Sequence, residues 1–203
     1  MPTLWRGIRV DRDITDRRTK AWRLKNYCFT MRIQALEDVM KSWSDLLNKM
    51  EIPFILNQSI VLGIHRNGKI FPNERVMEFA VIGDDLTPDK LKELKENKDY
   101  GYHYESSHIV PIGLLYFRDL ELQPIYFKNG KALYNLLEDD CLVYDEDLLR
   151  KENWEQIEYK ENTYNVPKDR EKFLTQAYGD WKTPNPSYNW KNDAKNRMKW
   201  DII

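Results

Sequence analysis

Two acidic residues in a strand-like segment are the first candidates for chemistry. Glu74 and Glu78 stand in the stretch NERVMEF, on either side of Val76. Alternate residues of a strand face the same side, so on an extended strand these three side chains would share one face, where two carboxylates can jointly hold a divalent cation. The strand rise separates the two acids by about 13 Å, however, so a pair of partly exposed strand acids is the alternative interpretation.

The other residue types that often carry chemistry are sparse. Cys28 and Cys141 form neither a CxxC pair nor a dense disulfide framework, which favours a reducing, cytoplasmic location and gives no indication of zinc. His65, His103 and His108 have no tight ligand spacing. We therefore expect these histidines to pack or lie at the surface, and we predict no histidine catalysis.

Length and charge limit the classes of function. The 203 residues, of which 41% are hydrophobic, suffice for one domain with a substantial core. The formal net charge of -1 gives no general argument for nucleic-acid binding. Residues 1–25 hold eight Lys or Arg against three Asp, and we expect this arm to be solvated or packed on its own domain. No run approaches the roughly 20 apolar residues of a membrane span, so we expect a soluble protein.

The hydrophobic pattern predicts the elements that must position the acids. Apolar residues recur at spacings of three and four from Ile33 to Met50, which predicts a helix that packs on a sheet. Val76 to Ile82 is rich in strand formers and is expected to be a central strand. Further extended segments are expected at 54–56, 108–117 and 123–127, an apolar element at 59–64, and a second helix at 88–97.

Turn residues punctuate these elements. Asn57-Gln58 and Asn67-Gly68 predict changes of chain direction, and residues 128–131 predict a hairpin or loop. Thr87 is expected to cap the helix that follows it. The breakers between aromatic residues in 181–190 predict an ordered surface loop.

Two stretches, ILNQSIVLGIHRNGKIFPNERVMEF and YNVPKDREKFLTQAYGDWKTP, follow an order that resembles the LicD/fukutin family. Proteins of that family have a helix leading into a strand, a small-residue turn with Gly and Arg, a glycine loop, a proline before alternating acids, and a closing aromatic motif. The matching positions here are Gly63, Arg66, Gly68, Pro72, Val166, Pro167 and Tyr178 to Trp181.

The resemblance implies an α+β fold, with a nucleotidyltransferase-like mixed β-sheet flanked by helices, over residues 33–184. Residues 1–32 would form a basic extension that packs on or flanks this domain, and 185–203 a tail. The resemblance also implies that Glu74 and Glu78 are catalytic and bind Mg2+ or Mn2+. It assigns Ser59, Gly63, Arg66 and Gly68 to substrate binding, and Tyr178, Asp180 and Trp181 to structure or substrate binding.

The acidic motif is incomplete, because the three family acids align with Glu74, Val76 and Glu78. Two arrangements would compensate for the missing central acid. Part of the segment could be a loop that brings Glu74 closer, or Asp119 or Glu121 from the neighbouring strand region could complete the site.

Three functions follow from these observations. The first, from the resemblance, is a transferase that moves phosphocholine or a phospho-sugar alcohol from a nucleotide-linked donor of the cytidine-diphosphate type to a glycan, with no base identified. The second is a catalytically silent member of the fold that binds a nucleotide, a glycan or a protein. The third, a nucleic-acid binder that uses the basic arm, is disfavoured by the near-zero net charge.

Overall fold

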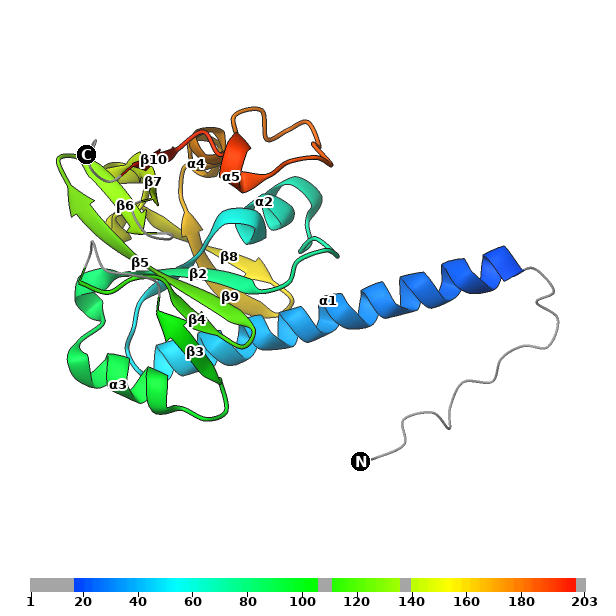
Figure 1. Ribbon diagram of the computed structural model, residues 1–203, viewed down its shortest axis with the longest axis horizontal. Coiled ribbons are helices and arrows are strands. Elements are labelled where there is room, and N and C mark those ends of the chain that lie inside the picture. Colours follow the sequence, from blue (N-terminus) through cyan, green and yellow to red (C-terminus); the bar gives the residue numbers. More distant parts are fainter. Residues whose placement is uncertain (1–16, 106–110, 136–139, 200–203) are drawn as a thin grey trace.

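A computed structural model of the chain describes residues 17–105, 111–135 and 140–199. It shows an α+β fold in which helices flank a mixed β-sheet (Figure 1). The predicted α+β class with a helix-flanked mixed sheet is therefore confirmed. Within the described ranges, no helix combines the length and apolar character needed to span a membrane.

The elements follow one another along the whole described chain. The helices are α1 (Arg17–Lys49), α2 (Gln58–Asn67), α3 (Pro88–Glu96), α4 (Arg170–Tyr178) and α5 (Trp190–Asp193). The strands are β1 (Phe54–Leu56), β2 (Met77–Ile82), β3 (Tyr102–Glu105), β4 (Leu115–Phe117), β5 (Leu120–Lys128), β6 (Lys131–Asn135), β7 (Asp140–Asp145), β8 (Trp154–Tyr159), β9 (Asn162–Pro167) and β10 (Arg197–Lys199). Short 3-10 turns lie at Gly83–Asp85, Glu146–Leu148 and Lys151–Asn153.

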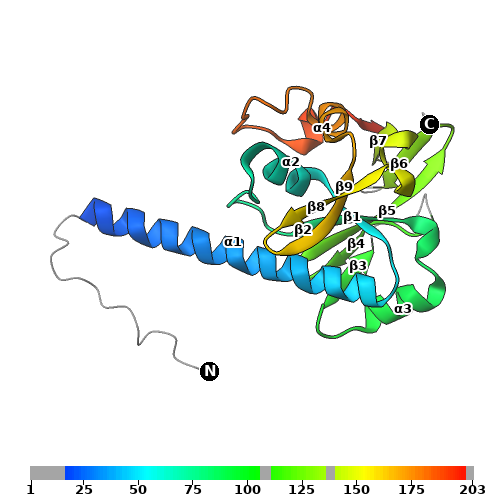
Figure 2. The ribbon, with the colours of Figure 1, turned by 180° about the vertical axis from the view of Figure 1, so that it is seen from behind.

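The main sheet has the strand order β1-β2-β5-β6-β7-β10, with β4 pairing β5 and β3 pairing β4. Its neighbouring pairs are antiparallel except β2 and β5, which run parallel. The second sheet is the β8–β9 hairpin. Seen from behind, this hairpin lies beside β1 (Figure 2), where the Asn165 side chain donates a hydrogen bond to the Phe54 carbonyl.

Helices cover the two faces of the main sheet. In Figure 1, α1 and α3 lie below it, and α2, α4 and α5 lie above it. The apolar stripe of α1 is buried in the core, and Trp43 makes edge contacts with the rings of Tyr100 and Phe117. The predicted helix over 33–50 is confirmed, but it begins at Arg17, so the expected boundary at residue 33 falls inside it.

Local predictions for turns and caps hold. The Thr87 hydroxyl accepts a hydrogen bond from the Lys90 amide at the start of α3. Asn129 and Gly130 have positive φ angles of 52° and 74° and join β5 to β6 as a hairpin. Both features depend on neighbours within a few residues, which is why sequence alone predicts them.

Two predicted strands differ from the structure. The strand expected at 108–117 is only β4, which begins at Leu115, while 108–110 lie outside the described residues. Side chains bind the backbone just before it: the Tyr126 hydroxyl bonds the amide and carbonyl of Ile112, and Glu105 accepts from the Gly113 amide. The backbone groups of Ile112 and Gly113 are therefore hydrogen-bonded by side chains and not by a neighbouring strand. The apolar element at 59–64 belongs to α2, and the strand at 123–127 to the longer β5.

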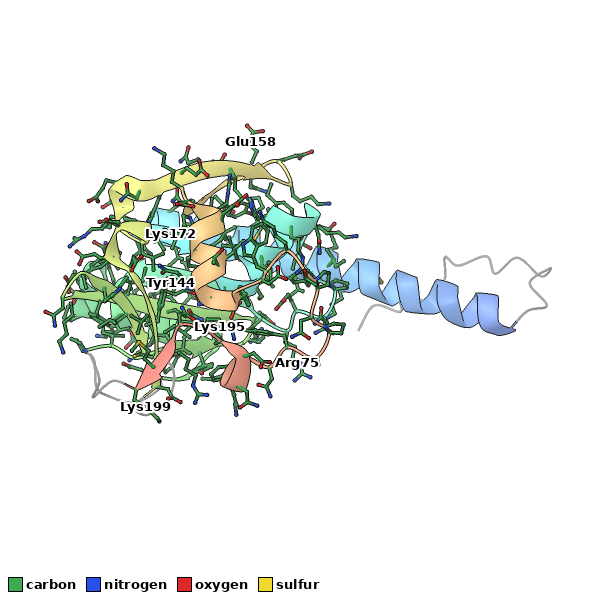
Figure 3. All side chains as sticks on the ribbon, turned by 90° about the horizontal axis from the view of Figure 1, so that it is seen from above. Arg75, Tyr144, Glu158, Lys172, Lys195 and Lys199 are labelled. Carbon is green, nitrogen blue, oxygen red and sulfur yellow. The ribbon has the colours of Figure 1, made fainter. Side chains whose placement is uncertain are left out.

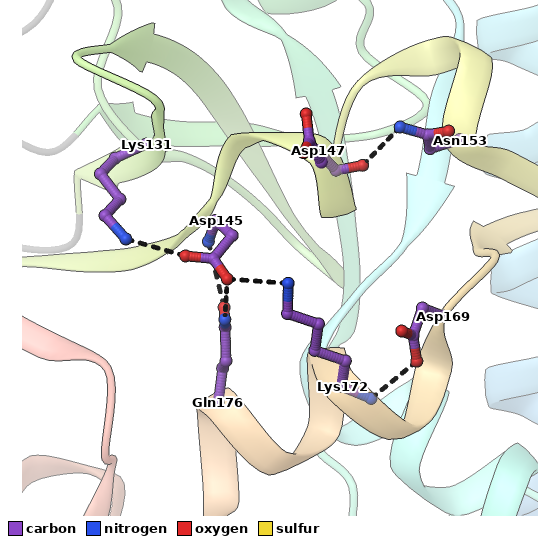
Figure 4. Close-up of polar contacts among 7 residues, drawn as sticks. All are labelled: Lys131, Asp145, Asp147, Asn153, Asp169, Lys172 and Gln176. Atoms are coloured by element: carbon purple, nitrogen blue, oxygen red, sulfur yellow. Dashed lines mark hydrogen bonds and ion pairs between the residues drawn. The ribbon is translucent and has the colours of Figure 1, made fainter.

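Asp145, at the end of β7, connects three elements through its side chain (Figure 4). It accepts from Lys131 on β6 at 2.8 Å, and from Lys172 at 2.9 Å and Gln176 at 2.6 Å on α4. Hydrogen bonds from Lys131 and Lys172 hold the pKa of the Asp145 carboxyl well below its ordinary value of 3.8. This network fixes α4 against the sheet.

We predict that Asp145→Asn lowers the free energy of unfolding by about 1 to 2 kcal/mol near neutral pH. The loss is modest because the Asp145 side chain is 34% exposed and water screens its ion pairs. A depressed folded-state pKa stabilises the protein above 3.8, and this contribution disappears as the pH falls from 3.8 through the folded-state pKa. Urea unfolding of both proteins should therefore show a difference that shrinks in strong acid.

Asp147→Asn is the matched control. Asp147 lies in the same region, but it accepts a hydrogen bond from Asn153 through its backbone carbonyl, which the substitution leaves unchanged (Figure 4). We expect this variant to unfold like the unmodified protein. A pH-independent loss of stability in Asp145→Asn would contradict the ion-pair explanation.

Candidate active site

Three carboxylates lie together on the face of the sheet that α2 and α4 cover. Glu78 on β2 and Glu121 on β5 are direct partners in the parallel strand pair, so their side chains point to the same face. Glu74 lies before β2, in the connection from α2. All three line a cavity of about 910 Å³.

The strand arrangement expected for Glu74, Val76 and Glu78 is wrong, because β2 begins at Met77 and leaves Glu74 and Val76 outside it. The Glu74 amide instead bonds the Phe71 carbonyl in a turn. A loop carries Glu74, and β5 places Glu121 beside Glu78 in the same cavity. Asp119 is not in the cavity lining, and its carbonyl accepts from the Met77 amide.

The first turn of α2 faces Glu78. The Ser59 amide and hydroxyl donate to the Glu78 carboxylate at 3.1 and 2.7 Å. The Asn57 amide bonds the Glu78 carbonyl at 3.0 Å, which ties the start of the helix to β2. The positive end of the helix dipole suits this end of α2 to negative charge, and the Ser59 amide already binds the Glu78 carboxylate there.

Buried polar side chains hold the start of α2 from below. The Asn57 side chain donates to Gln123 on β5 at 2.7 Å and accepts from the Tyr134 hydroxyl at 3.5 Å. The Gln58 side chain donates to the Tyr144 hydroxyl at 3.0 Å. Both amides are buried, so these bonds satisfy groups that would otherwise be costly to enclose.

Burial and mutual repulsion favour the protonated forms of the three acids. Enclosure by the protein, with smaller contributions from Glu121 and Glu74, raises the pKa of Glu78 to about 8, although the bonds from Ser59 oppose the shift. Burial also raises the pKa values of Glu74 and Glu121. Glu78 keeps some accessible surface because it faces the cavity, so water there moderates the effect.

The chemistry of these donors fits a divalent cation. Carboxylate oxygens are the ligands that Mg2+ and Mn2+ prefer, and a cation would offset the repulsion that raises the Glu78 pKa. In the described part of the chain, no three Asp, Glu, His or Cys side chains already converge as a complete metal site. Binding would therefore require the three glutamates to turn toward a common point.

Aromatic side chains form much of the remaining cavity wall. Half of them come from the segment after α4. The aromatic wall consists of Phe71, Tyr116, Tyr178, Trp181, Tyr188 and Trp190. Rings of this kind offer flat surfaces on which a planar ligand can stack.

The remaining predicted site residues divide between the cavity and the scaffold. Arg66 and Asp180 line the cavity. Arg66 donates to the Trp181 carbonyl at 3.0 Å, while its Nε atom is buried without a hydrogen-bond partner in the described structure. Asp180 accepts from the Thr183 amide at 3.4 Å.

The two predicted glycines are outside the cavity lining. A Cβ on Gly63 would lie 2.8 Å from the Lys69 carbonyl oxygen, so this glycine permits close packing of the chain against α2. Gly68 ends α2 in the left-handed conformation with φ 65°. The fold therefore requires glycine at both positions, and neither glycine contacts the cavity.

Sequence reasoning missed Tyr188, Trp190 and Asn196 as parts of the cavity wall. The aromatic residues of 181–190 were visible, but their spacing indicated only an ordered loop. That loop is present, and Trp181, Tyr188 and Trp190 line the same cavity as the carboxylates of β2 and β5. The clustering of aromatic residues in a segment rich in Pro and Asn was the sequence signal that could have indicated a cavity wall.

Similarity to known proteins is found among solved structures. No protein-family model matches the chain, and no curated protein matches it. Among solved structures, it is similar to the crystal structure of the lincosamide antibiotic adenylyltransferase LnuA with lincomycin bound. The two share 17% identity with a TM-score of 0.44, over 68% of this chain and 84% of LnuA. This likeness does not by itself assign an activity to the chain.

Proposed function

We propose that this protein is a metal-dependent transferase that moves a nucleotidyl or phosphoryl-linked group. The observation that supports this most directly is the meeting of Glu74, Glu78 and Glu121 in one cavity beside the start of α2. Carboxylates from neighbouring strands provide cation ligands, and the positive end of the α2 dipole would attract the phosphates of a donor.

Each residue has a distinct role in this proposal. Glu74, Glu78 and Glu121 hold Mg2+ or Mn2+, and Ser59 orients the Glu78 carboxylate through its two hydrogen bonds. When bound, the cation would neutralise charge on the donor's phosphates. Arg66, already fixed by the Trp181 carbonyl, would attract a phosphate oxygen through its guanidinium charge at the cavity wall. The aromatic wall limits the access of water.

The resemblance to LicD/fukutin proteins supports a narrower form of the proposal. In that form the donor is a cytidine-diphosphate compound, the transferred group is phosphocholine or a phospho-sugar alcohol, and the acceptor is a glycan.

A silent binding module is the second candidate. The observation that favours it is the state of Glu78, which is turned to Ser59 and has a pKa raised to about 8, so that its neutral form is favoured. A neutral carboxyl is a poor cation ligand. The cavity would then bind a nucleotide or glycan without reaction.

We predict that magnesium together with a nucleotide donor raises the melting temperature of the unmodified protein, and that Glu121→Gln removes most of this rise. Ligands that bind only the folded state stabilise it by mass action, by about 2.7 kcal/mol at a hundredfold excess over Kd. The measurement is a thermal-shift titration with CTP, ATP and CDP-choline, with and without Mg2+.

Glu158→Gln is the matched control, because it makes the same change at an exposed site on β8, far from the cavity lining (Figure 3). It should keep the full response. A donor response that is independent of magnesium would favour the silent module, and no response to any donor would exclude the proposed transferase.

A further inference from the structure

Asn196 is a buried polar residue whose two side-chain amide atoms have no hydrogen-bond partner among the described residues. It is 7% exposed and lines the cavity. Its amide lies beside the Tyr144 hydroxyl and opposes the burial-driven rise of the Tyr144 pKa, so the two groups interact without a hydrogen bond of good geometry. That hydroxyl already accepts from Gln58, and neither Asn196 amide atom has a hydrogen-bond partner in the described part of the chain. A buried amide left unpaired is costly, and such groups are rare in folded proteins.

The backbone around Asn196 is held firmly. Its carbonyl accepts from the Val143 amide of β7 at 2.9 Å, and the Lys195 amide donates to the Ala177 carbonyl of α4 at 3.0 Å. Tyr144 and Lys195 both lie beside α4 (Figure 3). The unpaired amide is therefore presented from a fixed position, which is characteristic of a recognition group.

Flat apolar surfaces lie in the same cavity. Tyr178 and Tyr188 line it with ring centroids 5.2 Å apart, and the Trp190 ring lines it as well. An asparagine amide offers one acceptor and two donor hydrogens, so it matches a planar ring with a hydrogen-bond donor beside an acceptor. Every common nucleobase has such an edge, and stacking on an aromatic side chain is worth about 1 to 3 kcal/mol per base.

We propose that Asn196 and the tyrosines Tyr178 and Tyr188 form the subsite that recognises the nucleobase of the ligand. This inference takes the ligand class, a nucleotide, from the proposed function. It adds the residues that would recognise the nucleobase. The nucleobase would pair with the Asn196 amide and stack against a tyrosine ring, leaving the phosphates toward the three glutamates. An amide group on an acceptor molecule has the same chemistry, so the test separates these two sources.

The test uses Asn196→Leu, which keeps the size of the side chain and removes both polar atoms. We expect this variant to melt at a higher temperature than the unmodified protein without ligand, because an unpaired buried amide is lost. Calorimetric titration with cytidine, uridine, adenosine and guanosine, without metal, should show at least about tenfold weaker binding of the preferred nucleoside. Asn192→Leu, on the exposed side of α5, is the matched control and should bind like the unmodified protein.

Tripolyphosphate with magnesium separates this inference from the proposed function. Its binding should need Glu121 and be unaffected by Asn196→Leu. Nucleoside binding without magnesium-dependent tripolyphosphate binding would leave the base subsite standing and reject the metal site. Equal nucleoside affinity in Asn196→Leu, or no binding of any nucleoside, would overturn the inference. Asn196-dependent binding of acetamide-bearing sugars but of no nucleoside would also overturn it, and would assign the amide to the acceptor.

Discussion

Replacing Glu78 by glutamine is expected to stabilise the protein while removing its magnesium response. In the folded state the pKa of Glu78 is raised to about 8 from its ordinary value of 4.5. Between these values the folded protein keeps a proton that the unfolded chain has lost, so the free energy of unfolding falls as the pH rises. Glutamine stays neutral and can still accept from Ser59, so the variant avoids this loss.

The expected gain in the free energy of unfolding is about 2 to 4 kcal/mol near pH 8. Each unit of pKa shift corresponds to about 1.36 kcal/mol, and water in the cavity reduces the total. Urea unfolding from about pH 5 to pH 9 measures it. The difference between Glu78→Gln and the unmodified protein should be small at the acidic end and grow until about pH 8. Parallel curves for the two proteins would show that Glu78 is not a strained carboxyl.

The second large effect is expected from Phe173→Ala in α4. Phe173 is completely buried, and its ring stacks on Tyr144 with centroids 4.7 Å apart. Removing such a ring typically costs about 3 to 5 kcal/mol, because contacts are lost and a cavity remains. Tyr144 in turn accepts from Gln58 at the start of α2, so the phosphate end of the site should loosen as well.

Chemical unfolding measures the stability of Phe173→Ala, and Phe173→Leu serves as its control. Leucine refills much of the volume, and we expect it to lose only about 1 kcal/mol. Similar losses in both variants would indicate that stacking, rather than volume, supports Tyr144. An alanine variant as stable as the unmodified protein would contradict the packing described for α4.

The parts predicted from sequence depend on short-range physics. The α1 stripe, the Thr87 cap and the Asn129-Gly130 turn each involve residues close in the chain. The strand at Val76 to Ile82 was placed correctly to within one residue, because a run of β-branched and aromatic residues bounded by Gly83 is a local signal.

The arrangement of the site depends on long-range pairing that no local pattern encodes. Glu121 meets Glu78 only because β2 and β5 pair in parallel with this register. The sequence offered Asp119 and Glu121 as equal alternatives, and a shift of one residue would have turned either away. Asn196 reaches the cavity because β10 pairs with β7. A strand of only three residues is too short to be predicted from the sequence pattern.

The division of the site along the chain has a consequence for biosynthesis. The carboxylates precede residue 122, whereas Tyr178, Tyr188 and Asn196 lie more than fifty residues further along the chain and are made later. Domains made from the N-terminus can begin to fold during synthesis. A nascent chain stopped before β7 would therefore carry its acidic cluster without Tyr178, Tyr188 and Asn196, so ligand binding should arise only after these later segments have been made.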